Sequence, residues 1–121
     1  MQYMLLIYND EQAWQRLADP ERNALIGEYL AFTDSIRESG NYVTGAPLQP
    51  TSTATSVRIR NSETLVTDGP FAETKEQLGG YYLVEAADAD EALAIAARIP
   101  GARYGTIEVR PVLPIAAEAP A

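Results

Sequence analysis

The chain has 121 residues, enough for one domain and too few for two, and its 9 basic and 17 acidic residues give a net charge of −8. So acidic a surface repels nucleic acid and anionic lipid. The absence of cysteine and histidine excludes disulfides, Ser-His-Asp triads and nearly all zinc sites. The first residues also lack the basic start of a signal peptide, so we expect a cytoplasmic domain. From the charge and the missing residue types we expect it to bind no nucleic acid, membrane, metal or cofactor.

Residues 2–8 predict a strand with apolar side chains on both faces. The two faces are Tyr3, Leu5 and Ile7, and Met4, Leu6 and Tyr8. Such a strand must be covered on both sides, which a single sheet with helices on one side does not achieve.

A helix over 20–39 is predicted from its start and its end. Asp19-Pro20 supplies a cap and a first-turn proline, and Gly40 stops the helix. The apolar stripe is Leu25, Tyr29, Phe32 and Ile36. A short segment around Trp14 predicts a helical turn before it.

Residues 42–48 and 79–86 predict two further strands. Between them, residues 53–60 and 64–67 predict a hairpin that turns at 61–63. We expect residues 68–76 to form a loop that contains one helical turn.

A second helix is predicted after Asp88, which caps it together with Glu91, and it ends at Pro100-Gly101. Its expected buried stripe is Ala89, Ala92, Leu93, Ala96 and Ile99. The last strand, 105–112, directs Ile107 and Val109 to one face and Glu108 and Arg110 to the other. We expect a single domain over 1–113 and a flexible tail over 114–121.

The order of elements is β-α-β, a hairpin and β-α-β, which predicts an α+β fold. Two helices cover only one face of a four-stranded antiparallel sheet. We therefore expect a homodimer in which two sheets pair through their other faces and enclose a cavity lined in part by Glu108 and Arg110.

Four segments, 3–8, 66–81, 97–102 and 107–111, resemble the YCII-related family. The tetrapeptide Asp-Gly-Pro-Phe at 68–71 is similar to the motif that names one of its subgroups. The resemblance implies a ferredoxin-like βαββαβ fold with an inserted hairpin, in the dimeric α/β-barrel superfamily, with a pocket between sheet and helices.

Relatives on this fold include muconolactone isomerases, cofactor-free monooxygenases and a dehydrochlorinase, and the subgroup is often encoded beside sigma factors. Members of the family typically carry a histidine on the first helix, paired with an aspartate. This chain has no histidine, and Tyr29 aligns near that position. Because a tyrosine with its ordinary pKa near 10 is a poor base, that pair does not carry over.

Asp68 is the first candidate for chemistry, and it has two interpretations. It accepts backbone N–H groups in a turn in which Gly69 takes a positive φ and Phe71 enters the core. Alternatively, it lies in a pocket wall as a general base or ligand anchor.

Two charged pairs and two tyrosines complete the candidates. Glu73 and Lys75 either belong to a solvated turn or face the cavity. In the second case Glu73 would transfer a proton and Lys75 would bind an anionic substrate. Glu108 and Arg110 form either a cross-strand or intersubunit ion pair, or a site where Arg110 holds a carboxylate and Glu108 moves a proton. Ligand contacts are also predicted for Tyr8 and Tyr29, although Tyr8, like Tyr81 and Tyr82, is better explained as a core or interface aromatic.

Two functions remain open from the sequence. One is a dimeric binding or regulatory module for a small anionic molecule, in a sigma-factor-linked context implied by the resemblance. The alternative is a cofactor-free isomerase, lyase or monooxygenase that uses carboxylate acid–base chemistry. The absence of histidine favours the binding module.

Overall fold

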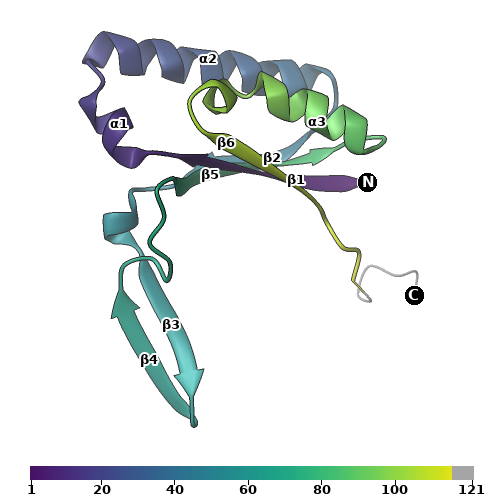
Figure 1. Ribbon diagram of the computed structural model, residues 1–121. Helices are drawn as coiled ribbons and strands as arrows, with labels where there is room; N and C mark the ends of the chain where they lie inside the picture. Colours follow the sequence, from purple (N-terminus) through teal and green to yellow (C-terminus); the bar gives the residue numbers. More distant parts are fainter. Residues whose placement is uncertain (116–121) are drawn as a thin grey trace.

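A computed structural model describes residues 1–115, which form an antiparallel sheet with helices on one face and a hairpin beyond it (Figure 1). The sheet has the strand order β2-β5-β1-β6. Its strands are β1 (Gln2–Asn9), β2 (Tyr42–Pro47), β5 (Gln77–Glu85) and β6 (Thr106–Pro111). The helices are α1 (Glu11–Arg16), α2 (Asp19–Glu38) and α3 (Ala89–Arg98), with short 3-10 turns at Thr51–Thr53 and Pro100–Arg103.

The predicted α+β class is confirmed. Most of the predicted tail, 116–121, lies outside the described residues.

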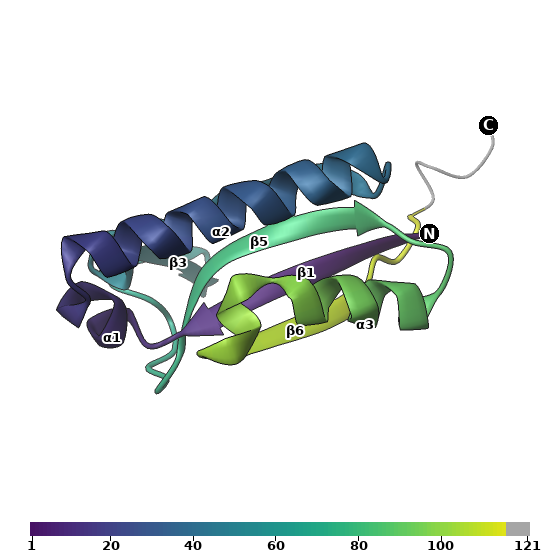
Figure 2. The same ribbon diagram turned by 90° about the horizontal axis from the view of Figure 1, so that it is seen from above.

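Strand β1 lies inside the sheet, antiparallel to both β5 and β6. Leu5 is opposite Tyr82 on one side and Val109 on the other, so these three side chains share a face. That face is covered by helices; in Figure 2, seen from above, α2 runs beside β5 and α3 lies over β6. The core between the layers is Tyr3, Leu5, Ile7, Phe32, Ile36, Tyr82, Val84, Ala86, Ala92, Ile95, Ala96 and Ile99.

Helix α2 follows the prediction closely, with one difference at its start. It begins at Asp19, so the cap position belongs to Ala18, whose N–H donates to Glu21 Oε1 at 3.3 Å. Asp19 does not act as the cap because its carboxylate accepts from the Arg22 guanidinium one turn later. The predicted stripe is confirmed in its second half, where Phe32 and Ile36 are buried, whereas Leu25 and Tyr29 are only partly buried.

Helix α3 has the predicted caps but a different buried face. Asp88 Oδ1 accepts the Glu91 N–H at 2.9 Å, and Glu91 Oε1 accepts the Ala87 N–H at 3.1 Å. The prediction that Ala89 and Leu93 are buried is wrong, since Leu93 is 54% exposed. The buried residues are Ala92, Ile95, Ala96 and Ile99, and this spacing of three, one and three follows the helical period.

The predicted hairpin is formed by β3 (Thr55–Arg60) and β4 (Glu63–Asp68). Its turn is Asn61–Ser62, both with positive φ (50° and 66°), as two-residue hairpin turns require. The hairpin extends from the sheet on the side opposite the helices (Figure 1).

The helical turn predicted within 68–76 is wrong, since no helix forms there. Gly69 has a φ of +97° and Pro70 has no N–H, so neither favours continuation as a helix. Beyond them, side chains satisfy the backbone carbonyls instead: the Thr74 hydroxyl donates to Glu76 O at 2.5 Å and Gln77 Nε2 to Thr74 O at 2.6 Å.

Candidate functional site

A cleft of about 640 Å³ opens between α2 and the β2–β5 side of the sheet. Helix α1 contributes Trp14 to its wall, α2 contributes Tyr29, Thr33 and Arg37, and β2 contributes Tyr42. The volume lies within the range of small-molecule sites, and the lining is mainly apolar and aromatic, as such sites usually are.

Hydroxyl groups join the sheet and α2 inside this cleft. Tyr82 Oη and Thr33 Oγ1 lie 2.7 Å apart, and Thr33 Oγ1 donates to Tyr29 O at 2.9 Å. Because the single Thr33 proton is used there, Tyr82 is the donor to Thr33. The Tyr82 ring also meets the edge of Phe32 at 5.2 Å and of Tyr42 at 6.4 Å between centroids, so its orientation is fixed from several sides.

Gly45 on β2 allows this aromatic arrangement. A Cβ at that position would lie 2.7 Å from Tyr82 Cδ1 and 2.8 Å from Tyr81 O, closer than any side chain tolerates. The absence of a side chain therefore lets the Tyr82 ring lie against the neighbouring strand.

The two charged side chains in the lining differ in how they are held. Both carboxylate oxygens of Glu11 are engaged by Thr51, its N–H and its hydroxyl each donating at 2.8 Å. Arg37 lies with its guanidinium carbon 4.6 Å from the Tyr42 ring centroid, and its ion pair with Asp34 is long, at 4.0 Å. Since 58% of the Arg37 side chain is exposed, its hydrogen-bond donors remain accessible.

Burial raises the pKa of both Tyr29 and Tyr82 above the ordinary value of 10. The hydrogen bond of Tyr29 with the Gly101 backbone and that of Tyr82 with Thr33 lower these pKa values, but by less than burial raises them. Both side chains are therefore neutral at physiological pH, where they act as hydrogen-bond donors and not as bases.

The sheet face opposite the helices carries a second group of apolar side chains. The strand pairings place Leu6 beside Tyr81, and Met4 beside Leu83, on this face. Within residues 1–115 no helix lies over it (Figure 1). We call it the open face; its apolar members are Met4, Leu6, Leu78, Tyr81 and Leu83.

Three of the predicted site residues meet on the open face. Tyr8 Oη donates to Glu108 Oε1 at 3.2 Å, and Arg110 Nε donates to Glu108 Oε2 at 2.8 Å. The ion pair thus joins two residues of one strand, β6, whereas a cross-strand or intersubunit pair was predicted. Desolvation and the Glu108 carboxylate raise the pKa of Tyr8. Of the predicted ligand contacts, only Tyr29 lies in the cleft.

The remaining candidates, Asp68, Glu73 and Lys75, lie on the hairpin and in the loop after it. They are separate from the cleft and from the Tyr8, Glu108 and Arg110 group on the open face. Glu73 and Lys75 are exposed, and within residues 1–115 no hydrogen bond reaches the Asp68 carboxylate. Gly69 has the predicted positive φ. The expectation that Phe71 enters the core is wrong, since it is 80% exposed: the loop leaves the sheet on the side away from the helices, and the core is filled by other residues.

Sequence reasoning missed the cleft residues of α2 other than Tyr29. The signal was available, because Ile26, Tyr29, Thr33 and Arg37 follow at three, four and four residues and so share one face of the helix. Ile26 and Leu30 are 47% and 63% exposed, although both are large and apolar. An apolar residue exposed beside the buried stripe is typical of a helix that borders a cleft.

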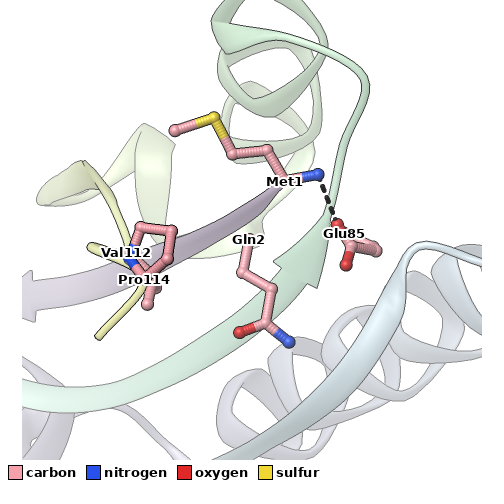
Figure 3. A pocket seen from close by; sticks show the side chains of 5 residues that line it. All are labelled: Met1, Gln2, Glu85, Val112 and Pro114. Atoms are coloured by element: carbon pink, nitrogen blue, oxygen red, sulfur yellow. Dashed lines mark ion pairs between the residues drawn. The ribbon is translucent and has the colours of Figure 1, made fainter. Parts of the chain in front are cut away.

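A second hollow, of about 300 Å³, lies where the two ends of the described chain meet (Figure 3). It is lined by Met1, Gln2, Glu85, Val112 and Pro114. The Met1 ammonium and the Glu85 carboxylate are 2.7 Å apart and neutralise each other, so this hollow has no charge left to hold an ionic ligand. Within residues 1–115 there is neither a cluster of three acidic side chains suited to a metal nor a helix long and apolar enough to cross a membrane.

Comparisons with known proteins agree on a family. The YCII-related domain matches residues 1–116. An uncharacterised protein of Rhizobium meliloti (strain 1021) is 40% identical over 114 residues, which cover 93% of this chain and 92% of the relative. Among solved structures, the 5-chloro-2-hydroxyhydroquinone dehydrochlorinase of Burkholderia phenoliruptrix AC1100, in complex with 2,5-dihydroxybenzoquinone, is similar with a TM-score of 0.54 over 93% of this chain and 94% of that one. At 14% identity this likeness concerns the fold alone.

Proposed function

The chain belongs to the YCII-related family, and we propose that it is a binding module for a small aromatic anion held in the cleft between α2 and strands β2 and β5. The observation that carries the proposal is the accessible Arg37 guanidinium, placed among aromatic side chains in a cleft of about 640 Å³.

The lining determines the class of ligand. Trp14, Tyr29 and Tyr42 offer aromatic surfaces suited to a flat ring. Arg37 offers a planar donor pair that matches a carboxylate. Thr51 holds both oxygens of the Glu11 carboxylate, and the ion pair between Arg37 and Asp34 is long, so the Arg37 donors remain accessible to a ligand.

Binding is favoured over proton transfer by the state of the cleft hydroxyls. Tyr29 and Tyr82 have raised pKa values and keep their protons at neutral pH, so neither abstracts a proton from a ligand. The carboxylate in the lining, Glu11, is tied by its hydrogen bonds to Thr51. The cleft therefore offers the Tyr29 hydroxyl and the Arg37 guanidinium as the donors that hold an anion.

A second candidate is a cofactor-free enzyme of the isomerase, lyase or monooxygenase type, which the fold shared with a dehydrochlorinase supports. In that case Tyr29 would donate to negative charge that develops on a ring oxygen, as an oxyanion-hole donor does. Tyr29→Phe would then reduce turnover while ligand affinity changed little.

We further place the chain in the Asp-Gly-Pro-Phe subgroup on residues 68–71, with the sigma-factor-linked regulatory setting that this resemblance implies. We also infer a homodimer through the open face. The apolar row that includes Met4, Leu6 and Leu83 supports the pairing, because a soluble chain seldom leaves such a face without a partner. This pairing would enclose Glu108 and Arg110.

The test of the ligand class is a titration with 2-hydroxybenzoate and, as its uncharged match, 2-hydroxybenzamide. Trp14 is the one tryptophan of the chain and lines the cleft, so its indole NMR signal reports binding there. We expect saturable binding of the benzoate at least tenfold tighter than the amide, and loss of that preference in Arg37→Gln. Equal binding of both compounds, or no response at Trp14, would contradict the proposal.

A further inference from the structure

The β3–β4 hairpin has an apolar face that no part of the described chain covers. In its register Val57 lies opposite Val66, and Ile59 lies two residues further along the same face. These side chains are 62%, 64% and 65% exposed. The other face carries charged and polar side chains, among them Arg58 and Thr67, with Leu65 as its one apolar member, so the hairpin is amphipathic.

A hairpin of this kind is not stable without support. Two isolated strands are marginal in water, and persistent hairpins pack an apolar face on something else. Within residues 1–115, the hydrogen bonds at its base stay inside the hairpin and its flanks: Gly69 N–H donates to Ala54 O at 2.7 Å, and the Ser56 hydroxyl donates to Gly69 O at 2.8 Å. Neither strand packs extensively on another element.

The position of the hairpin indicates what covers it. It extends from the same side of the sheet as the open face (Figure 1). Two sheets paired face to face lie about 10 Å apart, whereas a six-residue strand spans roughly 20 Å. In a dimer paired through the open faces, the hairpin of one copy therefore reaches past the sheet of the other.

We propose that the hairpin is a clasp whose face of Val57, Ile59 and Val66 packs on a second copy of this chain. The inference rests on the open-face homodimer proposed above, and it adds a second contact surface to it. The hairpin carries two arginines, Arg58 and Arg60, and two acids, Glu63 and Asp68, so its own net charge is zero. It therefore adds nothing to the repulsion between two copies of net charge −8.

The test compares two neighbouring positions on β4 that point to opposite faces. Val66→Glu adds a negative charge to the apolar face, and Thr67→Glu adds the same charge to the other face. By sedimentation equilibrium we expect the dimer dissociation constant to rise at least tenfold in Val66→Glu and to stay within about threefold of the parent in Thr67→Glu. Equal dissociation constants for the two variants overturn the clasp.

A second measurement does not depend on how the variant folds. In the parent protein, amides of residues 55–68 should exchange more slowly at concentrations where the dimer forms than in dilute monomer. Protection that does not change with concentration overturns the clasp while leaving sheet pairing intact. A chain that is monomeric at every concentration overturns both, and neither result affects ligand binding in the cleft, which is measured separately at Trp14.

Discussion

The hydroxyl oxygens of Thr33 and Tyr82 lie 2.7 Å apart and join the middle of α2 to β5. Thr33 is one turn from Tyr29 and one turn from Arg37, so this bond sets how far the cleft-lining face of α2 stands from the sheet. The width of the cleft thus depends on a partly buried polar contact as well as on apolar packing.

Removing the Tyr82 hydroxyl should destabilise the protein modestly. Tyr82→Phe keeps the ring against Phe32 but leaves Thr33 with its bond to Tyr29 O alone, so we expect a loss of about 1 kcal/mol in the free energy of unfolding. Urea denaturation measures it. The matched control is Tyr104→Phe, at an exposed tyrosine, which should cost close to nothing. If Tyr104→Phe lost as much unfolding free energy as Tyr82→Phe, the hydrogen bond between Tyr82 and Thr33 would not explain the loss.

Two glycine-to-alanine changes should have opposite signs. At Gly45 the new methyl group would lie 2.7 Å from the Tyr82 ring and 2.8 Å from Tyr81 O, so we expect destabilisation of about 1–3 kcal/mol. At Gly27, inside α2, nothing lies within 4 Å, so alanine should stabilise by about 0.5–1 kcal/mol through helix propensity. Thermal unfolding of both variants decides the matter; a stabilised Gly45→Ala would refute the close approach of Tyr82 to β2.

Stability should fall in alkaline solution because of the buried tyrosines. Folding raises the pKa of Tyr29 and Tyr82, so the folded state binds their protons more tightly than the unfolded state does. The stabilisation that these two protons give the folded state is complete below pH 10. It is lost as the pH rises through the pKa values that Tyr29 and Tyr82 have in the folded state. Urea midpoints between pH 8 and pH 11 should therefore decline above pH 10, and less steeply in the Tyr29→Phe/Tyr82→Phe double variant. Identical declines in parent and double variant would exclude these residues as the cause.

The open face should determine the oligomeric state. Leu83→Glu places a charge in the apolar row beside Met4, and we expect it to convert a dimer into a folded monomer. Leu93→Glu makes the same change on the exposed side of α3 and should leave the dimer unchanged. Light scattering measures the mass of each variant in solution, and circular dichroism spectra check that both variants are folded. A dimer that survives Leu83→Glu would mean that the copies pair elsewhere.

Local patterns were enough to predict the helices and strands. The cap at Asp88 and the stripe through Phe32 and Ile36 depend only on residues within a few turns, and both are confirmed. The buried face of α3 was predicted with two wrong members, Ala89 and Leu93, because its many alanines mark no face clearly.

The site was harder to predict, because it depends on which elements come together. Tyr29, a predicted ligand contact, lines the cleft, but Arg37 enters the lining only because α2 lies over β2 and β5. Phe71 was expected in the core for its apolarity, although the loop carries it outward. Sequence periodicity does not indicate which side of the sheet such a loop follows.

The most direct test of the account is a crystal structure of the protein grown with 2-hydroxybenzoate. The account predicts density for the compound in the cleft, with its carboxylate on the Arg37 guanidinium and its ring among Trp14, Tyr29 and Tyr42. Density on the open face against Arg110, with the cleft holding none, would contradict it.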